Sequence, residues 1–139
     1  EFGKIEEEAH AHGLPVIVWM YPRGKAIKND VSGDILAYAA RIGLELGADI
    51  VKMKYNGNPA DLRWAVKSAG KAKIIIAGGM KKDEKKLVRD TYDIMQNGAC
   101  GLAIGRNMWQ HKNPLKLAKA LKKIIFYGAK PKEALKELI

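Results

Sequence analysis

The fold is decided by one stretch, residues 49–69, which reads DIVKMKYNGNPADLRWAVKSA. It begins with the mostly apolar run Asp49–Lys54, which has the length of a strand. After a short loop, Asn58 stands directly before Pro59, a pair typical of a helix whose first turn begins with proline. Residues 59–69 keep an amphipathic spacing up to Gly70, where a helix C-cap favours a positive φ. The stretch therefore predicts a strand followed by a helix.

This strand–helix unit is repeated four times along the 139 residues. The apolar runs predict strands at Pro15–Met20, Asp49–Lys54, Lys73–Ala77 and Cys100–Ile104. The amphipathic segments after them predict helices at Gly33–Leu46, Pro59–Ala69, Glu84–Asn97 and Pro114–Phe126. Two more helices are predicted near the ends of the chain, at Ile5–His12 and Pro131–Ile139. Glycines stand where the C-caps of these helices are expected, at positions 13, 47, 70, 98 and 128.

Strands joined by helical crossovers run parallel, which leaves a doubly wound sheet or a barrel as the possible architecture. A dinucleotide-binding sheet would have a Gly-x-Gly-x-x-Gly turn after its first strand, but this chain has Tyr21-Pro22-Arg23-Gly24 there. We therefore expect an α/β fold of the (β/α)₈ TIM-barrel type. A complete barrel needs eight units and about 250 residues. Residues 1–139 are accordingly predicted to be a half-barrel, strands five to eight, whose N-terminal half is missing.

The bulk composition excludes several classes of protein. The longest apolar runs are strand-sized, far short of the roughly 20 residues that a membrane-spanning helix needs. A single cysteine cannot form an intramolecular disulfide, so we expect a cytoplasmic protein. The net charge of +10 suggests nucleic-acid binding, but the lysines are spread over every predicted helix and form no basic stripe with interleaved aromatics. We therefore expect neither a nucleic acid nor a membrane as a partner.

Two lysines lie inside the second predicted strand, in Val51-Lys52-Met53-Lys54-Tyr55. Side chains two residues apart share one face of a strand, with Cα atoms roughly 6–7 Å apart. Each ammonium disfavours the charge of the other, and burial acts in the same direction, so one lysine should supply a neutral amine nucleophile. The alternative is an edge strand with solvated lysines. Because uncompensated charges are costly in a central parallel strand, we expect a functional pair.

The first predicted strand places two aromatic residues on one face, Trp19 and Tyr21. Tyr21 stands at the carboxyl end of that strand, where barrel active sites are built, and a phenol there can transfer protons. Trp19 can equally be a core residue or a wall of the pocket.

The loops after the third and fourth predicted strands contain Gly78-Gly79 and Gly105-Arg106. Glycines let backbone N–H groups approach an anion, and an arginine can bind phosphate oxygens with two hydrogen bonds. In a TIM barrel the loops after strands seven and eight form the usual phosphate site. On the last strand, Gly101 and Ala103 are expected to line the barrel interior near that phosphate.

No metal site is predicted. His10 and His12 lie two apart on a helix, so they do not face each other, and are expected at the surface near the helix C-terminus. His111 is isolated in the sequence, and Cys100 is expected to be a small core residue facing the helices.

Over its whole length the chain resembles the C-terminal half of the archaeal-type class I fructose-bisphosphate aldolases. Four blocks carry the resemblance: Trp19-Met20-Tyr21-Pro22-Arg23-Gly24, Gly47-Ala48-Asp49-Ile50-Val51-Lys52-Met53-Lys54-Tyr55, Ala77-Gly78-Gly79, and Gly101-Leu102-Ala103-Ile104-Gly105-Arg106-Asn107-Met108-Trp109-Gln110. A single Gly-Gly or Gly-Arg pair would mean little, but four blocks in this order and spacing are specific.

The resemblance implies a Schiff-base aldolase that interconverts fructose 1,6-bisphosphate with dihydroxyacetone phosphate and glyceraldehyde 3-phosphate. It implies that Lys52 forms the Schiff base and that Tyr21 is the general acid/base. The implied substrate-binding residues are Trp19, Lys54, Gly78, Gly79, Gly105 and Arg106, the last four holding a phosphate. It further implies that no metal or organic cofactor takes part, that the substrate is a phosphorylated sugar, and that the protein is a homo-oligomer.

A sister group is similar almost to the same degree: the 2-amino-3,7-dideoxy-D-threo-hept-6-ulosonate synthases, which carry out a transaldol reaction in aromatic biosynthesis. They share the block Tyr21–Lys25 and often an ending like Glu133–Glu137. Trp19 and Lys54 favour the aldolases instead. The chain departs from the aldolase pattern after Gly79, where Met80–Asp83 replace a proline and threonines.

A catalytic aspartate that the family has on its first strand lies outside this half of the barrel. The polypeptide alone is therefore expected to be inactive. A non-catalytic half-barrel that assembles with itself or with a complementing chain remains an alternative hypothesis of a different class.

Overall fold

The computed structural model describes all 139 residues, which form four strands and a series of helices. The elements in chain order are α1 (Phe2–Ala11), β1 (Ile17–Trp19), α2 (Gly33–Glu45), β2 (Ile50–Met53), α3 (Pro59–Ser68), β3 (Lys73–Ala77), α4 (Glu84–Gln96), β4 (Gly101–Ala103), α5 (Arg106–Trp109), α6 (Pro114–Tyr127), α7 (Pro131–Ala134) and the 3₁₀-helix η1 (Leu135–Leu138). None of the helices is long and apolar enough to cross a membrane.

Each predicted strand and helix is present, but the structure differs from the prediction in two short helical segments. The four-residue helix α5 was not predicted, because it is too short to show a helical period. The predicted last helix, Pro131–Ile139, is divided into α7 and η1. Strand β3 has the predicted bounds, whereas β1, β2 and β4 are shorter than predicted, at three or four residues, because their ends continue as irregular loops.

The capping side chains and glycines act as predicted. Asn58 accepts a hydrogen bond from the Ala60 N–H group at the start of α3, and Asn113 accepts one from Lys116 at the start of α6. Each glycine expected at a C-cap has a positive φ: Gly13, Gly47, Gly70, Gly98 and Gly128.

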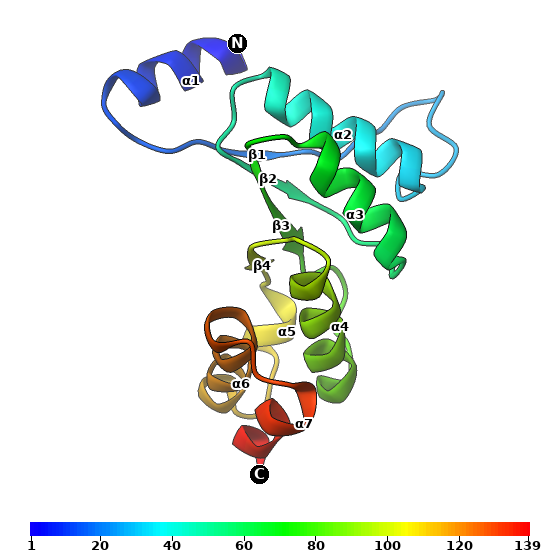
Figure 1. Ribbon diagram of the computed structural model, residues 1–139, viewed down its shortest axis with the longest axis vertical. Coiled ribbons are helices and arrows are strands. Elements are labelled where there is room, and N and C mark those ends of the chain that lie inside the picture. The colour runs from blue at the N-terminus through cyan, green and yellow to red at the C-terminus, as the bar shows by residue number, and fades with distance from the viewer.

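The strands form one parallel sheet in the order β1-β2-β3-β4, so each strand lies beside its neighbour in the chain. In Figure 1 the sheet occupies the middle of an elongated molecule, with α1, α2 and α3 towards one end and α4 to α7 towards the other. Sequential parallel strands with helical crossovers are the arrangement of half a (β/α)₈ barrel, which confirms the predicted fold class.

The register aligns two rows of side chains across the sheet. One row contains Trp19, Lys52, Ile75 and Gly101, and the adjacent row contains Val18, Val51 and Ile74. Successive residues of a strand point to opposite faces, so these rows belong to opposite faces of the sheet.

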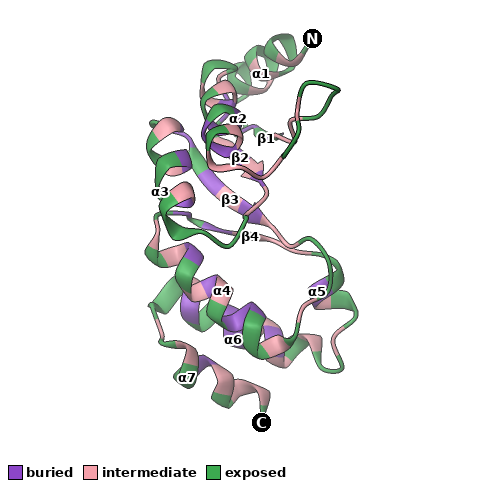
Figure 2. Cartoon of the chain, turned by 90° about the vertical axis from the view of Figure 1, so that its right-hand side faces the viewer, coloured by how far each residue is buried: buried purple, intermediate pink, exposed green.

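The outer face of the sheet is covered by helices. Val51 and Ile74 are 0% and 2% exposed, and they join a core that includes Leu36 of α2 and Leu62 of α3. A second cluster packs α4 against α6 and α7, through residues such as Val88 and Leu117. Figure 2 shows these buried segments along the strands and between the helices. Burying one such side chain stabilises the fold by about 1.5–3 kcal/mol.

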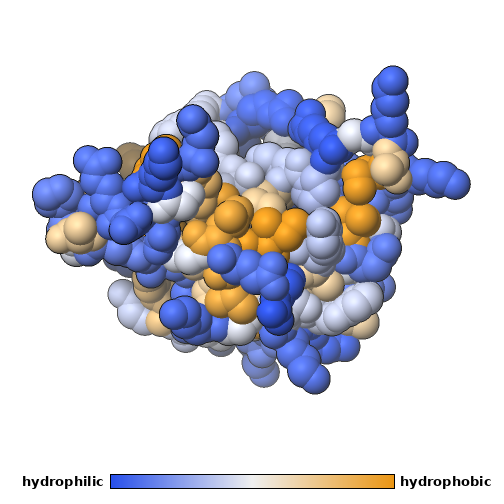
Figure 3. Space-filling view, turned by 90° about the horizontal axis from the view of Figure 1, so that it is seen from above, coloured by the Kyte–Doolittle hydropathy of each residue, from blue (hydrophilic) through white to orange (hydrophobic).

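The inner face of the sheet is open in this chain. Ile17 is 48% exposed and Trp19 is 67% exposed, although both lie on a strand. Figure 3, which looks along the long axis, shows hydrophobic residues reaching the surface inside a mostly hydrophilic outline. A complete barrel would cover this face with the side chains of its other strands.

Helix α1 is anchored by an ion-pair cluster that the sequence did not reveal. The His10 ring lies 2.6 Å from Glu6 and 2.9 Å from Asp49, and Asp49 accepts a hydrogen bond from the Val16 N–H group at 2.7 Å. The hydrogen bond with Asp49 raises the pKa of His10 above its ordinary 6.5. His10 therefore connects α1 to the start of β2, a more specific role than the predicted surface position.

Two further expectations need correction. Cys100 is exposed and not a core residue: it precedes β4 at the edge of the sheet, and its thiol donates to the Ile74 carbonyl at 3.3 Å. His111 is not isolated, because its Nε2 atom lies 2.9 Å from a carboxylate oxygen of Glu84.

Candidate active site

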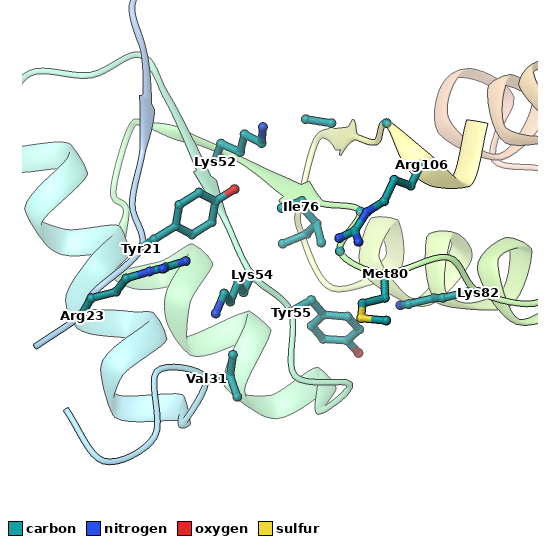
Figure 4. A pocket seen from close by; sticks show the side chains of 15 residues that line it. Tyr21, Arg23, Val31, Lys52, Lys54, Tyr55, Ile76, Met80, Lys82 and Arg106 are labelled. Atoms are coloured by element: carbon teal, nitrogen blue, oxygen red, sulfur yellow. The ribbon is translucent and has the colours of Figure 1, made fainter. Parts of the chain in front are cut away.

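A cavity of about 610 Å³ opens at the carboxyl ends of the strands. It is lined by every predicted site residue except Trp19, namely Tyr21, Lys52, Lys54, Gly78, Gly79, Gly105 and Arg106. Ala103, which was expected to line the barrel interior, is also part of the wall. Residues without a predicted role complete it: Arg23, Val31, Tyr55, Ile76, Ala77, Met80 and Lys82. Figure 4 shows cationic and aromatic side chains converging on this space from all four strand ends. Parallel strands bring their carboxyl ends to one edge, and this explains why residues distant in sequence meet.

Lys52 projects from the inner face of β2. Its Nζ atom lies 4.1 Å from the centre of the Trp19 ring, directly across the sheet in register. This cation–π contact orients the lysine side chain. Lys52 forms no ion pair with a carboxylate, whereas its neighbour Lys54 does. Trp19 thus contacts the lysine without lining the cavity.

Lys54 forms an ion pair with Asp30, which comes from the loop after β1. The hydrogen bond from Lys54 holds the pKa of Asp30 below its ordinary 3.8, and the charge of Arg23 acts in the same direction. The sequence predicted that the two lysines would disfavour each other as uncompensated charges. The structure corrects this expectation, because a carboxylate balances one of the pair.

Tyr21 extends beyond the carboxyl end of β1 into the cavity. In Figure 4 its hydroxyl group is directed into the space that Lys52 also lines. Arg23 follows two residues later on the same side and points into the cavity near Lys54. The irregular backbone of the loop, in place of a longer strand, carries both side chains past the edge of the sheet.

Gly78 and Gly79 differ in how closely other atoms pack against them. A Cβ atom on Gly78 would lie 2.7 Å from Cγ2 of Ile104, so glycine is required there for close packing of the two loops. The Gly78 N–H group donates to the Ala103 carbonyl at 3.2 Å and is therefore occupied. Gly79 has a φ of +63°, and a Cβ atom on it would meet nothing within 4 Å, so it faces open space.

Gly105 and Arg106 lie at the start of α5. A Cβ atom on Gly105 would meet nothing closer than the Trp109 side chain at 3.9 Å, so packing within the chain does not require glycine. The N–H groups of Gly79 and Gly105 donate no hydrogen bond to the backbone. Arg106 is exposed, and Figure 4 shows its guanidinium group directed towards Ile76 and Met80, which line the same cavity. Free N–H donors and a guanidinium group suit an oxyanion such as phosphate.

Asp30, Tyr55 and Asn107 stand out among the residues of the site that were not predicted from the sequence. Asp30 lies in a polar loop, and no pattern links it to Lys54. Tyr55 lines the cavity, and burial raises its pKa above 10.0, with Asp93 and Asp90 adding to the effect. Asn107, only 3% exposed, connects the two glycine loops. Its place directly after Gly105-Arg106 was the one available signal.

No group of three or more His, Cys, Asp or Glu side chains is arranged to hold a metal ion. The polar groups of the cavity are mainly cationic, from Arg23, Lys52, Lys54, Lys82 and Arg106. Such a wall favours an anionic ligand.

The family model and the individual relatives that match this chain agree with one another. Residues 1–111 match the family model described as DeoC/LacD family aldolase. The class 1 fructose-bisphosphate aldolase of Thermoproteus tenax is 44% identical over 136 residues, which are 97% of this chain and 52% of that protein. The 2-amino-3,7-dideoxy-D-threo-hept-6-ulosonate synthase 1 of Archaeoglobus fulgidus is 37% identical over 123 residues, 88% of this chain and 45% of that protein. The chain spans about half the length of the curated relatives it matches.

Solved structures agree in fold. An archaeal fructose 1,6-bisphosphate aldolase superposes with a TM-score of 0.87 at 45% identity, covering 93% of this chain and 51% of that one. An archaeal fructose-1,6-bisphosphate aldolase whose catalytic lysine is covalently bound to the carbinolamine intermediate superposes with a TM-score of 0.85 at 43% identity, covering 90% and 50%. The chain therefore belongs to the DeoC/LacD family of aldolases, and over its length it is similar to half of an archaeal class I fructose-bisphosphate aldolase barrel.

Proposed function

We propose that this chain supplies the Schiff-base half of a class I aldolase that interconverts fructose 1,6-bisphosphate with dihydroxyacetone phosphate and glyceraldehyde 3-phosphate. One observation carries the proposal: Lys52, without a carboxylate partner, opens on the same cavity as the Tyr21 phenol and the Gly79 and Gly105-Arg106 loops. The relatives named as fructose-bisphosphate aldolases support the choice of substrate.

The reaction begins at Lys52. In its neutral form the amine attacks the C2 carbonyl of the ketose, and loss of water from the carbinolamine gives an iminium ion. The C3–C4 bond then breaks, and its electron pair flows into the iminium to give an enamine, while the C4 hydroxyl proton passes to a base. Glyceraldehyde 3-phosphate leaves, the enamine is protonated at C3, and water hydrolyses the resulting iminium to release dihydroxyacetone phosphate and free Lys52.

Tyr21 is the proposed proton carrier for both transfers. Its hydroxyl lies in the cavity that Lys52 lines, and it stands at the end of the strand next to β2. It accepts the C4 hydroxyl proton during cleavage and returns a proton to the enamine carbon afterwards, so one group serves both half-reactions.

The phosphate is proposed to bind at the glycine loops. Gly79 and Gly105 supply N–H groups that are free of backbone acceptors, and Arg106 supplies its guanidinium group. The Gly78 N–H group is already bonded to Ala103, so Gly78 supports this site by allowing close packing. Lys54, held by Asp30, is proposed to donate a hydrogen bond to the sugar, and Trp19 orients Lys52 beside it.

The chain is proposed to work as a C-terminal half-barrel, strands five to eight, in a complete barrel. The open inner face and the half-length match to full aldolases support this arrangement. The other four units would cover the inner face and supply further catalytic groups, and we propose that complete barrels associate as homo-oligomers.

The test is borohydride trapping on the complete barrel, meaning this chain together with the four units that complete it. Dihydroxyacetone phosphate and sodium borohydride should add the reduced triose phosphate to Lys52, as peptide mass spectrometry would show. Lys54→Met is the matched control, because it removes the other lysine of the strand and should keep the adduct. An adduct on Lys54, or none on either lysine, would contradict the proposal, and a barrel that gives none would favour a non-catalytic assembly module.

The heptulosonate synthase is the second candidate, since the Archaeoglobus fulgidus relative of that name matches 88% of the chain. Both enzymes would form a Schiff base, so trapping does not separate them. Assays with fructose 1,6-bisphosphate alone and with an amino-acid semialdehyde as acceptor would. Turnover that requires the semialdehyde would overturn the first choice.

A further inference from the structure

Asn107 is one of two buried polar side chains in the chain, at 3% exposed, and both the nitrogen and the oxygen of its amide form hydrogen bonds. Its Nδ2 group donates to the carbonyl oxygens of Gly78 and Met80, each at 3.1 Å, and its Oδ1 atom accepts from the Lys82 N–H group at 2.7 Å. All three partners lie in the loop between β3 and α4, whereas Asn107 belongs to α5. One side chain thus joins the two loops at three points.

The bond to Gly78 also fixes the direction of a neighbouring donor. In a trans peptide unit the carbonyl of one residue and the N–H group of the next point in opposite directions, and the chain has no cis peptide bond. Because Asn107 holds the Gly78 carbonyl, the Gly79 N–H group of the same peptide unit faces away from Asn107. That N–H group has no backbone acceptor, and Gly79 lines the cavity.

Asn107 is also fixed to the second loop by the chain itself. It directly follows Arg106, so the turn that places the buried amide also places the guanidinium group. We infer that Asn107 is a positioning residue that sets the Gly79 N–H group and Arg106 at the separation needed to bind one phosphate. This inference rests on the proposed function and assigns no contact between Asn107 and the substrate.

A second link between the loops provides a matched control. The Lys81 Nζ atom donates to the Gln110 carbonyl at 2.8 Å, joining the same two segments at the exposed surface. That bond involves no group of the cavity wall, and Lys81 does not line the cavity. Lys81→Met should therefore loosen the loops slightly without redirecting a donor.

The test compares Asn107→Leu, which keeps the side-chain size, with Lys81→Met and the unaltered complete barrel. Two readouts are needed: the inhibition constant of inorganic phosphate, and borohydride trapping of unphosphorylated dihydroxyacetone. Asn107→Leu should raise the phosphate inhibition constant and KM for the bisphosphate about 10- to 100-fold. The reason is that the Gly79 N–H group would no longer be held in the position where it binds phosphate, and a displacement of about 1 Å can cost this much. Trapping of dihydroxyacetone should change by less than about twofold, as for Lys81→Met.

Other outcomes are decisive. Equal losses of phosphate binding and dihydroxyacetone trapping would make Asn107 merely structural and overturn the inference, as would an unchanged inhibition constant. If Asn107→Leu does not fold, Asn107→Ser, which keeps a polar group but cannot span the loops, should show the same selective loss. If the unaltered barrel forms no adduct at Lys52, the proposed function fails instead, so the two failures are distinguishable.

Discussion

Val51 and Lys52 are consecutive residues of β2, but they lie on opposite faces of the sheet and in different environments. Val51 is 0% exposed beneath the helices, whereas Lys52 opens on the cavity and contacts the exposed Trp19 ring. The outer face is uniformly apolar, and the inner face carries the cations. The comparison shows that the fold depends on one face of four short strands and the proposed chemistry depends on the other.

The largest effect is expected at the inner face, from Lys52→Met in the complete barrel. Removing the nucleophile should lower kcat/KM by about 10⁴-fold or more, and it should abolish the borohydride adduct. Steady-state kinetics and mass spectrometry give both values. A variant that keeps its adduct would place the Schiff base on another residue. It would contradict the assignment of the chemistry to Lys52 on the inner face.

Tyr21→Phe should have the next largest effect. Removing the proposed proton carrier should lower kcat by about 10²- to 10⁴-fold, the usual range for general acid–base catalysis. The adduct at Lys52 should still form, since the carbonyl is attacked by another group. If kcat and the extent of trapping fell together, Tyr21 would be needed for Schiff-base formation itself.

The outer face is tested by Ile74→Ala, with Ile75→Ala as its control on the opposite face of the same strand. Ile74 is 2% exposed, so its truncation should lower the free energy of unfolding by about 2–5 kcal/mol, measured by denaturant titration. Ile75 pairs in register with Lys52 on the inner face. In the complete barrel, where the other four units are proposed to cover the inner face, Ile75→Ala should cause a similar loss, and a loss below about 1 kcal/mol would contradict that covering.

The smallest effect concerns the ion pair of Lys54 and Asp30. Lys54→Met should raise the pKa of the Asp30 carboxyl towards its ordinary 3.8, which NMR titration would measure. Since the folded-state pKa is lowered, the stability from this pair is present above pH 3.8 and is lost as the pH falls through the folded-state value. An unchanged Asp30 titration in Lys54→Met would assign the shift to Arg23.

The elements of the fold were largely predictable, because their signals are local. Apolar runs, Asn-Pro caps and C-cap glycines each depend on a few neighbouring residues. What escaped prediction was either too short to be periodic, as with α5, or depended on distant contacts. Cys100 was assigned to the core from strand alternation alone, whereas its exposure follows from its place at the sheet edge.

For the candidate site, the sequence by itself determined which side chains stand at strand ends, because alternation and glycine positions follow from backbone geometry. The pair Lys52 and Lys54, Tyr21 and the glycine loops were identified in this way, and the resemblance to the aldolases then implied that Lys52 forms the Schiff base. Only the tertiary structure decided how those groups differ from one another. It paired Lys54 with Asp30, occupied the Gly78 N–H group, and joined the loops through Asn107. These distinctions arise from contacts between segments far apart in the chain, which a one-dimensional pattern does not record.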